Sequence, residues 1–122
     1  DLMVELFGRH RRTVGSQKSY NNHIGVPLTI LAADESTEVL VCEIGTSGPG
    51  EISALSRLAR PDIAVVTLIG AGHLEKLGAI EGVAREKSDL PASLGPDGLF
   101  VLDADGEFAG FLRSTTQART LS

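Results

Sequence analysis

The feature of this sequence that most clearly points to chemistry is a run of apolar residues that ends in one carboxylate. Residues 39–51 read VLVCEIGTSGPGE, so Glu43 follows a short apolar stretch and precedes a glycine-rich turn. A carboxylate at the carboxyl end of a buried strand lies where open α/β sheets bind their ligands. The pattern alone fits equally well a glutamate that only faces solvent, so Glu43 is a candidate whose role depends on its surroundings.

Two later segments repeat this arrangement. Residues 62–69 are mostly apolar and lead into GAGHLEKLG, and residues 98–102 lead into DADGE. The carboxyl ends of parallel strands meet at one edge of a sheet, so the three runs together predict a site at that edge. Among the polar residues of these two segments, His73 and Asp103 are the candidates for such a site. A single histidine in a loop is more often a surface residue than a ligand, so the pattern alone does not assign His73.

The elements that must position these residues alternate between strand and helix patterns. The predicted strands are residues 13–15, 38–44, 63–69 and 99–102, and the predicted helices are residues 2–7, 27–31, 50–60, 80–89 and 108–112. Such alternation predicts an α/β fold with a mostly parallel sheet flanked by helices. Residues 114–122 continue neither pattern, and we predict a frayed tail there.

Length and composition limit the classes of function. A chain of 122 residues fits one domain, and its net charge is −5. Basic residues cluster only at residues 9–12, so nucleic acid is not expected as a partner. No apolar stretch approaches the roughly twenty residues of a membrane helix, so membrane insertion is not expected. Cys42 is the only cysteine, which excludes an internal disulfide, predicts a buried inert thiol and is compatible with the cytoplasm.

Three segments together resemble one protein family. They are YNNHIGVPLTIL at residues 20–31, EIGTSGPGEISALSRLARPDIAVVTLIGAGHLEKLGAIEGVAREKSDL at residues 43–90 and GPDGLFVLDAD at residues 95–105. In order and spacing they resemble the central domain of the Mur ligases, over residues 1–105. The resemblance implies a three-layer, P-loop-NTPase-like α/β fold and an ATP-dependent amide-bond ligase of peptidoglycan synthesis. It is closest to the branch that joins D-alanyl-D-alanine to UDP-N-acetylmuramoyl-tripeptide, which would be the partners.

The resemblance implies three metal ligands. Glu43 matches the glutamate that binds magnesium in the family, and His73 matches the histidine that helps to bind a second magnesium. Lys87 matches a lysine that the family carries as a carbamate, which would be catalytic and would supply an anionic oxygen to the metal. From the pattern alone, a lysine beside charged neighbours on an amphipathic helix is typical of a solvated side chain. ATP and Mg²⁺ are therefore the implied cofactors.

The resemblance also implies nucleotide contacts. Asn21, Asn22 and His23 match a loop beside the phosphates and the reacting carboxylate, so Asn21 and Asn22 are expected to bind the cofactor, and Asn22 and His23 to be catalytic. Asparagine also suits tight turns, which leaves a structural role open. Asp103 stands near the adenine and ribose where the family usually has asparagine, so it keeps an acceptor and loses an amide donor. Residues 48–50 are expected to start a helix whose N-terminus could attract an anion.

The family places a P-loop immediately before the helix that residues 1–7 resemble. We therefore expect a partial central domain without the N-terminal UDP-sugar domain, the P-loop or the C-terminal domain, and no turnover by this chain alone. Two alternatives stay open. One is a non-catalytic remnant or binding module, which is favoured by Leu68 because the family usually has asparagine there. The other is a related Mur-type ligase with another amino-acid acceptor.

Overall fold

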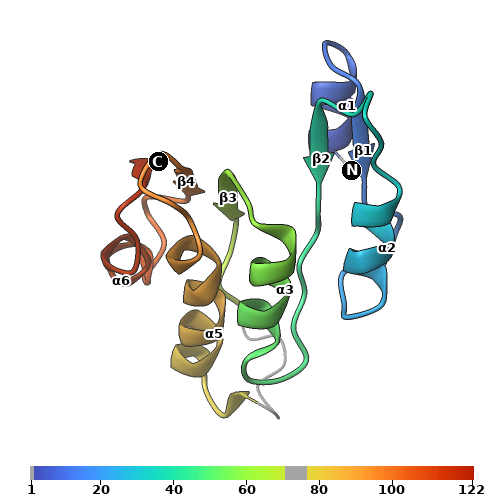
Figure 1. The fold of residues 1–122 in the computed structure, drawn as a ribbon. Helices are drawn as coiled ribbons and strands as arrows, with labels where there is room; N and C mark the ends of the chain where they lie inside the picture. Colours follow the sequence, from blue (N-terminus) through green and yellow to red (C-terminus); the bar gives the residue numbers. More distant parts are fainter. Residues whose placement is uncertain (1, 71–76) are drawn as a thin grey trace. The chain divides into compact units, whose positions relative to one another are not determined.

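The computed structural model describes residues 2–70 and 77–122. In chain order the elements are α1 (Leu2–Gly8), β1 (Thr13–Gly15), α2 (Gly25–Leu31), β2 (Val39–Val41), α3 (Glu51–Ala59), β3 (Ile63–Val66), α5 (Ile80–Ala92), β4 (Leu99–Leu102), α6 (Ala109–Ser114) and β5 (Arg119–Leu121) (Figure 1). The chain divides into two compact units, residues 1–45 and residues 46–122. Each unit holds its own parallel sheet.

The first unit is built on the parallel pair β1 and β2, in which Thr13 lies opposite Val39. The segment that connects the two strands includes α2, as a parallel connection requires. Val26 of α2 is completely buried, and α1 packs against both strands. The unit thus places the segment that follows β2 beside the loop that precedes α2.

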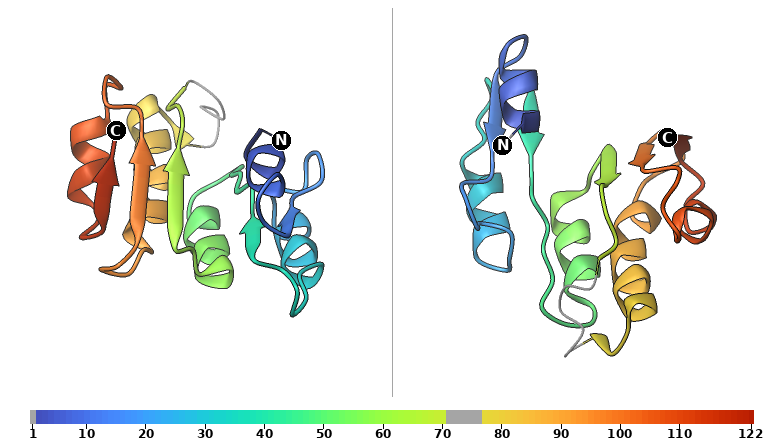
Figure 2. Two further views of the ribbon diagram at one scale, coloured as in Figure 1. Left: turned by 90° about the horizontal axis from the view of Figure 1, so that it is seen from above. Right: turned by 180° about the vertical axis from the view of Figure 1, so that it is seen from behind.

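The second unit contains a three-stranded sheet in the order β3-β4-β5. All three strands run in the same direction, as Figure 2 shows, and Val66 lies opposite Leu102 at the carboxyl ends of β3 and β4. Residues 119–121 pair with β4, so the prediction of a frayed tail was wrong. Three residues are too few to show a strand period in the sequence, but the second edge of β4 gives them a partner.

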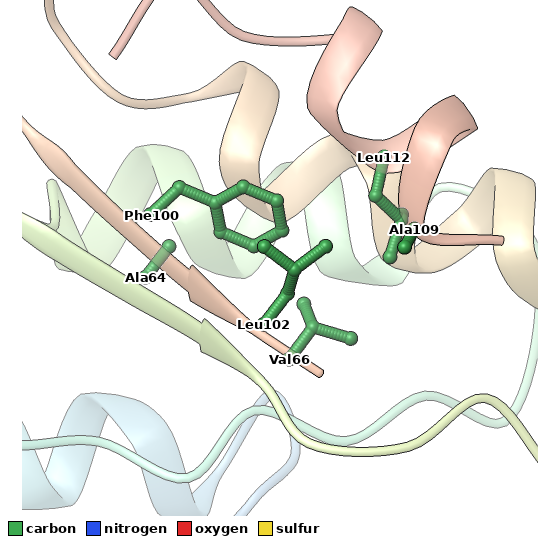
Figure 3. Close-up of a cluster of buried hydrophobic side chains, with 6 residues drawn as sticks. All are labelled: Ala64, Val66, Phe100, Leu102, Ala109 and Leu112. Carbon is green, nitrogen blue, oxygen red and sulfur yellow. The ribbon is translucent and has the colours of Figure 1, made fainter. Parts of the chain in front are cut away.

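The core of the second unit lies between this sheet and α6. Alternate residues of β3 and β4 point to one face, and with α6 they form a cluster of Ala64, Val66, Phe100, Leu102, Ala109 and Leu112 (Figure 3). Phe100 is completely buried. Leu90 and Leu94 pack against the cluster from α5 and the residues that follow it. This packing fixes the carboxyl ends of β3 and β4, from which the predicted site residues follow.

Several element ends differ from the prediction. Strands β2 and β3 end at Val41 and Val66, three residues earlier than predicted in each case. After β2 the Ser16 amide still donates to the Val41 carbonyl, but the Glu43 amide donates to the Ser16 hydroxyl, so the backbone ladder stops. Helix α5 continues three residues beyond the predicted end and includes Pro91.

Cys42 therefore follows β2 and is only partly buried. Burial nevertheless raises the pKa of its thiol, which favours the unreactive protonated form. None of the helices in residues 2–70 and 77–122 is both long enough and apolar enough to span a lipid bilayer.

Candidate functional site

Glu43 lies just beyond β2 in the first unit, and hydrogen bonds hold it on both its side chain and its backbone. Its Oε1 accepts a hydrogen bond from Asn21 Nδ2 at 3.0 Å, and its backbone amide donates to Ser16 Oγ at 3.0 Å. The side chain is exposed, and no hydrogen bond reaches Oε2 from the described residues. Glu43 thus presents an oriented carboxylate with one oxygen accessible to water.

Asn21 is held against the strand end by a second hydrogen bond. The Gly45 amide donates to the Asn21 carbonyl at 2.8 Å. A Cβ atom at Gly45 would lie 3.0 Å from the side-chain amide of Asn21, so glycine allows this close approach. The prediction that Asn21 binds the cofactor stays a prediction, and the structure shows that Asn21 orients Glu43.

Asn22 lies three residues before helix α2 and shapes the turn that leads into it. Its Oδ1 accepts hydrogen bonds from the amides of Ile24 at 3.0 Å and Gly25 at 2.9 Å, and its carbonyl accepts from the Val26 amide. This is the structural role that asparagine can take at a turn, and the predicted catalytic role of Asn22 stays a prediction. His23 is exposed, and its predicted role also stays a prediction.

Lys87 lies on α5 in the second unit and reaches the carboxyl end of β3. Its Nζ donates a hydrogen bond to the Leu68 carbonyl at 2.7 Å. The side chain is partly buried, which differs from the solvated side chain that is typical of the local sequence pattern alone. Burial lowers the pKa of Lys87, which enlarges the neutral fraction of the amine. Because the contact uses the backbone of residue 68, a leucine side chain there does not remove it.

Glu86 is a buried carboxylate whose role the sequence did not reveal. It is 6% exposed, and its Oε1 and Oε2 accept hydrogen bonds from the amides of Ile52 at 2.9 Å and Gly50 at 2.8 Å. Thr46 Oγ1 lies 3.5 Å from Oε1. The only sequence signal is its position three residues after Val83, which is also buried on the same helix.

The N-terminus of α3 bonds one of the protein's own carboxylates through its backbone amides, and the loop before it bonds another. Glu86 accepts from two of its amides, and Glu51 Oε2 accepts from the Ser47 amide at 2.6 Å. The Ser47 amide holds the pKa of Glu51 below its ordinary value. Gly50 has φ +81°, a left-handed conformation that favours glycine.

Asp103 follows β4 and is exposed. Its Oδ1 accepts a hydrogen bond from the Asp105 amide at 3.1 Å, which shapes the turn after the strand. Asp103 borders a cavity of about 100 Å³ at the carboxyl ends of β3 and β4, where Leu68, Ile69 and Phe108 supply apolar walls. The prediction that this residue contacts the nucleotide is compatible with such a place.

The predicted metal site is only partly described. His73 lies in residues 71–76, outside the described residues, and Glu43 and Lys87 belong to different units. A site shared by these three residues stays a prediction. Within residues 2–70 and 77–122 no group of three or more His, Cys, Asp or Glu side chains could hold a metal ion. The chemistry of Glu43 fits Mg²⁺ nonetheless, because this ion binds one or two carboxylates and keeps several waters.

Comparisons with known proteins give consistent results. The model of the Mur ligase middle domain matches residues 1–122. The chain is 44% identical over 105 residues to the UDP-N-acetylmuramoyl-tripeptide–D-alanyl-D-alanine ligase of Bacillus subtilis, covering 86% of this chain and 23% of that protein. It is similar in structure to MurF from Acinetobacter baumannii, with a TM-score of 0.94 and 25% identity over 99% of this chain and 27% of that one.

A second solved structure is MurF ligase from Thermotoga maritima in complex with ADP. It has a TM-score of 0.84 and 29% identity, covering 98% of this chain and 28% of that one. These likenesses confirm the predicted α/β fold with parallel strands flanked by helices. The chain spans about a quarter of the length of the relatives that it matches.

Proposed function

The chain belongs to the family of the Mur ligase middle domain, and from that premise we propose that it is the central part of a cytoplasmic ATP-dependent amide-bond ligase. The proposed reaction joins D-alanyl-D-alanine to UDP-N-acetylmuramoyl-tripeptide in peptidoglycan precursor synthesis. The identity of 44% to the Bacillus subtilis ligase of that name supports this choice of substrates. The rest of the ligase would supply the UDP-sugar domain, the P-loop and the C-terminal domain.

The proposed reaction has two steps. A carboxylate oxygen of the tripeptide attacks the γ-phosphorus of ATP, and the bond from that phosphorus to the ADP oxygen breaks. The amine of D-alanyl-D-alanine then attacks the carbon of the acyl phosphate, the carbon–oxygen bond to phosphate breaks, and the amine loses a proton. Negative charge is spread over phosphoryl oxygens, so the reaction depends on positioning and electrostatic stabilisation.

We propose that Glu43, His73 and a carbamate on Lys87 hold Mg²⁺. Bound Mg²⁺ would neutralise charge on the phosphoryl oxygens. The exposed carboxylate of Glu43, which Asn21 orients, supports its role as a ligand. The part of this chain is to present the oxygen atoms in a fixed direction before the substrates bind.

The observation that carries the proposal is the environment of Lys87. A carbamate forms when a neutral amine nitrogen attacks the carbon of carbon dioxide and loses a proton. The partly buried Nζ of Lys87 has a lowered pKa because of burial, and it lies 2.7 Å from the Leu68 carbonyl at the carboxyl end of β3. Burial favours the neutral amine, and the hydrogen bond to Leu68 places the nitrogen near the edge of the sheet where ligands bind.

Asp103 is the proposed contact to the adenine of ATP. Asp103 borders the small cavity at the ends of β3 and β4, and its carboxylate could accept a hydrogen bond from the exocyclic amine of adenine. We propose that Asn21, Asn22 and His23 lie near the phosphates and the reacting carboxylate. The Thermotoga maritima relative, whose structure is a complex with ADP, supports nucleotide binding.

The test uses a reconstituted ligase, in which this chain takes the place of the matching segment of the Bacillus subtilis ligase. Phosphate release is measured with ATP, Mg²⁺ and UDP-N-acetylmuramoyl-tripeptide, with and without D-alanyl-D-alanine, beside the unaltered Bacillus subtilis enzyme. The proposal expects release that requires D-alanyl-D-alanine. Nucleotide binding without turnover would support the non-catalytic alternative, and faster turnover with a single amino acid would support another acceptor.

A further inference from the structure

Glu86 ties two elements of the second unit together through buried polar contacts. Its side chain comes from α5, whereas the two amides that it bonds belong to Gly50 and Ile52 at the start of α3, 36 and 34 residues away in the sequence. The carboxylate is 6% exposed, so water competes little for these bonds. The contact fixes α5 relative to the first turn of α3.

Few of the buried side chains of α5 are large enough to fix the rotation of the helix against its neighbours. The buried residues of α5 are Val83, Ala84, Glu86, Ser88 and Pro91. Alanine and serine present small surfaces that fit a neighbouring helix in more than one rotation, whereas a carboxylate with two amide donors fits in one. Glu86 therefore adds a directional contact to the apolar contacts of this helix.

The next residue along α5 is Lys87. Consecutive residues of an α-helix point about 100° apart, so a helix whose residue 86 faces α3 must direct residue 87 to a neighbouring side. In this molecule that side is the end of β3, where Lys87 Nζ meets the Leu68 carbonyl. A rotation of α5 that broke the Glu86 bonds would also move Lys87 away from Leu68.

We infer that Glu86 is a positioning residue of the ligase: by bonding the first turn of α3, it sets the rotation of α5 that holds Lys87 at the carboxyl end of β3. The inference rests on the proposed function, in which Lys87 carries the carbamate. Glu86 touches neither substrate nor metal in this account and acts only through Lys87.

A double-mutant cycle in the reconstituted ligase tests this role. The substitution Glu86→Gln keeps the size of the side chain but leaves one oxygen for two amide donors. It is made in the unsubstituted ligase and in the Lys87→Ala variant assayed with added acetate. We expect Glu86→Gln to lower kcat about tenfold in the first background with KM values changed less than about twofold, and to have almost no effect in the second.

Glu51→Gln is the matched control. Glu51 also accepts hydrogen bonds from the loop before α3, but its partners, Ser47 and Thr46, belong to that loop rather than to α5. Glu51→Gln should change kcat by the same factor in the unsubstituted ligase and in the Lys87→Ala variant. Occupancy of the Lys87 carbamate, measured with ¹³C-labelled bicarbonate, should fall in Glu86→Gln and not in Glu51→Gln.

The outcomes separate the positioning role of Glu86 from the proposed ligase function. An equal loss from Glu86→Gln in both backgrounds, or no loss in either, would overturn the positioning role while the proposed function stands. If acetate does not restore the Lys87→Ala variant, the carbamate comparison decides in its place, and equal occupancy in Glu86→Gln and the unsubstituted ligase overturns the role. An inactive unsubstituted ligase, beside an active Bacillus subtilis enzyme, would contradict the proposed function itself.

Discussion

The segment after β2 and helix α5 prepare their candidate ligands in opposite ways. Glu43 is exposed, its side chain is a carboxylate, and the side-chain amide of Asn21 orients it. Lys87 is partly buried and cationic in its ordinary form, and its neighbour Glu86 is buried and bonded to backbone amides. In the proposed function the first region would offer a metal ligand directly, whereas the second would first convert an amine to a carbamate, which burial of the amine and a rigid helix would favour. The predictions below test this difference, from the largest effect to the smallest.

The largest effect is expected from Lys87→Ala in the reconstituted ligase. The substitution removes the proposed carbamate together with the contact to Leu68, so kcat should fall about 1,000-fold, which corresponds to several kcal/mol of lost charge stabilisation. Added acetate or propionate should restore part of the rate by filling the vacated space. The measurement is phosphate release with and without these acids. An alanine variant with full activity would make Lys87 an ordinary surface residue.

Glu43→Gln should have the next largest effect. Glutamine keeps an oxygen that can accept from Asn21 but loses the negative charge, so we expect about a 100-fold loss of activity and a higher Mg²⁺ requirement. The measurement is the rate as a function of Mg²⁺ concentration. Asn21→Ala is the companion variant: it keeps the charge and loses the orientation, and it should cost about tenfold. A larger loss from Asn21→Ala than from Glu43→Gln would contradict Glu43 as the ligand.

Glu86→Ala should loosen the start of α3. It leaves the amides of Gly50 and Ile52 without their acceptor, at a cost of about 2 kcal/mol, so hydrogen exchange in residues 46–52 of the reconstituted ligase should accelerate roughly 30-fold. Mass spectrometry of the peptides measures this change. Glu81→Ala, on an exposed position of the same helix, is the control and should leave exchange unchanged. Equal exchange in the two variants would show that the Glu86 bonds contribute little.

The smallest effect is on pH dependence. Burial lowers the pKa of Lys87 in the folded protein, so between the folded and unfolded values the unfolded chain binds more protons and stability rises with pH. The amine should also react with an acylating reagent at a lower pH than the ordinary value of lysine allows. Competitive labelling of the reconstituted ligase across a pH series checks this, in buffer free of carbon dioxide so that the amine is not converted to the carbamate. A titration of Lys87 at or above the ordinary value would contradict the burial seen here.

The sequence was sufficient to predict those features that depend on a local pattern of residues or on a complete motif. Strand 99–102 was predicted with its observed bounds, and α3 ends at Ala59, directly before the Arg60–Pro61 pair that was predicted to close it. Glu43 was predicted at the carboxyl end of an apolar strand, and the structure places it two residues beyond β2, which ends earlier than predicted. These features are encoded within a few residues of one another.

Other features depend on partners far along the chain. Glu86 bonds residues more than 30 positions away, and a glutamate between Arg85 and Lys87 gives no local sign of burial. Strand β5 exists because β4 offers it an edge, and β3 ends where its pairing with β4 ends. The roles of His73 and of the shared metal site stay predictions, and so does the absence of turnover by this chain alone.

The most direct test of the proposed ligase reaction traces the transfer of a labelled oxygen atom from the substrate carboxylate to phosphate. The reconstituted ligase is supplied with UDP-N-acetylmuramoyl-tripeptide whose terminal carboxylate carries ¹⁸O, together with ATP, Mg²⁺ and D-alanyl-D-alanine, and the released phosphate is analysed by mass spectrometry. An acyl phosphate transfers one carboxylate oxygen to phosphate, so each phosphate should contain one ¹⁸O atom and the amide product should keep the other. Phosphate without ¹⁸O would mean that ATP is only hydrolysed, which would contradict the ligase reaction proposed for this chain.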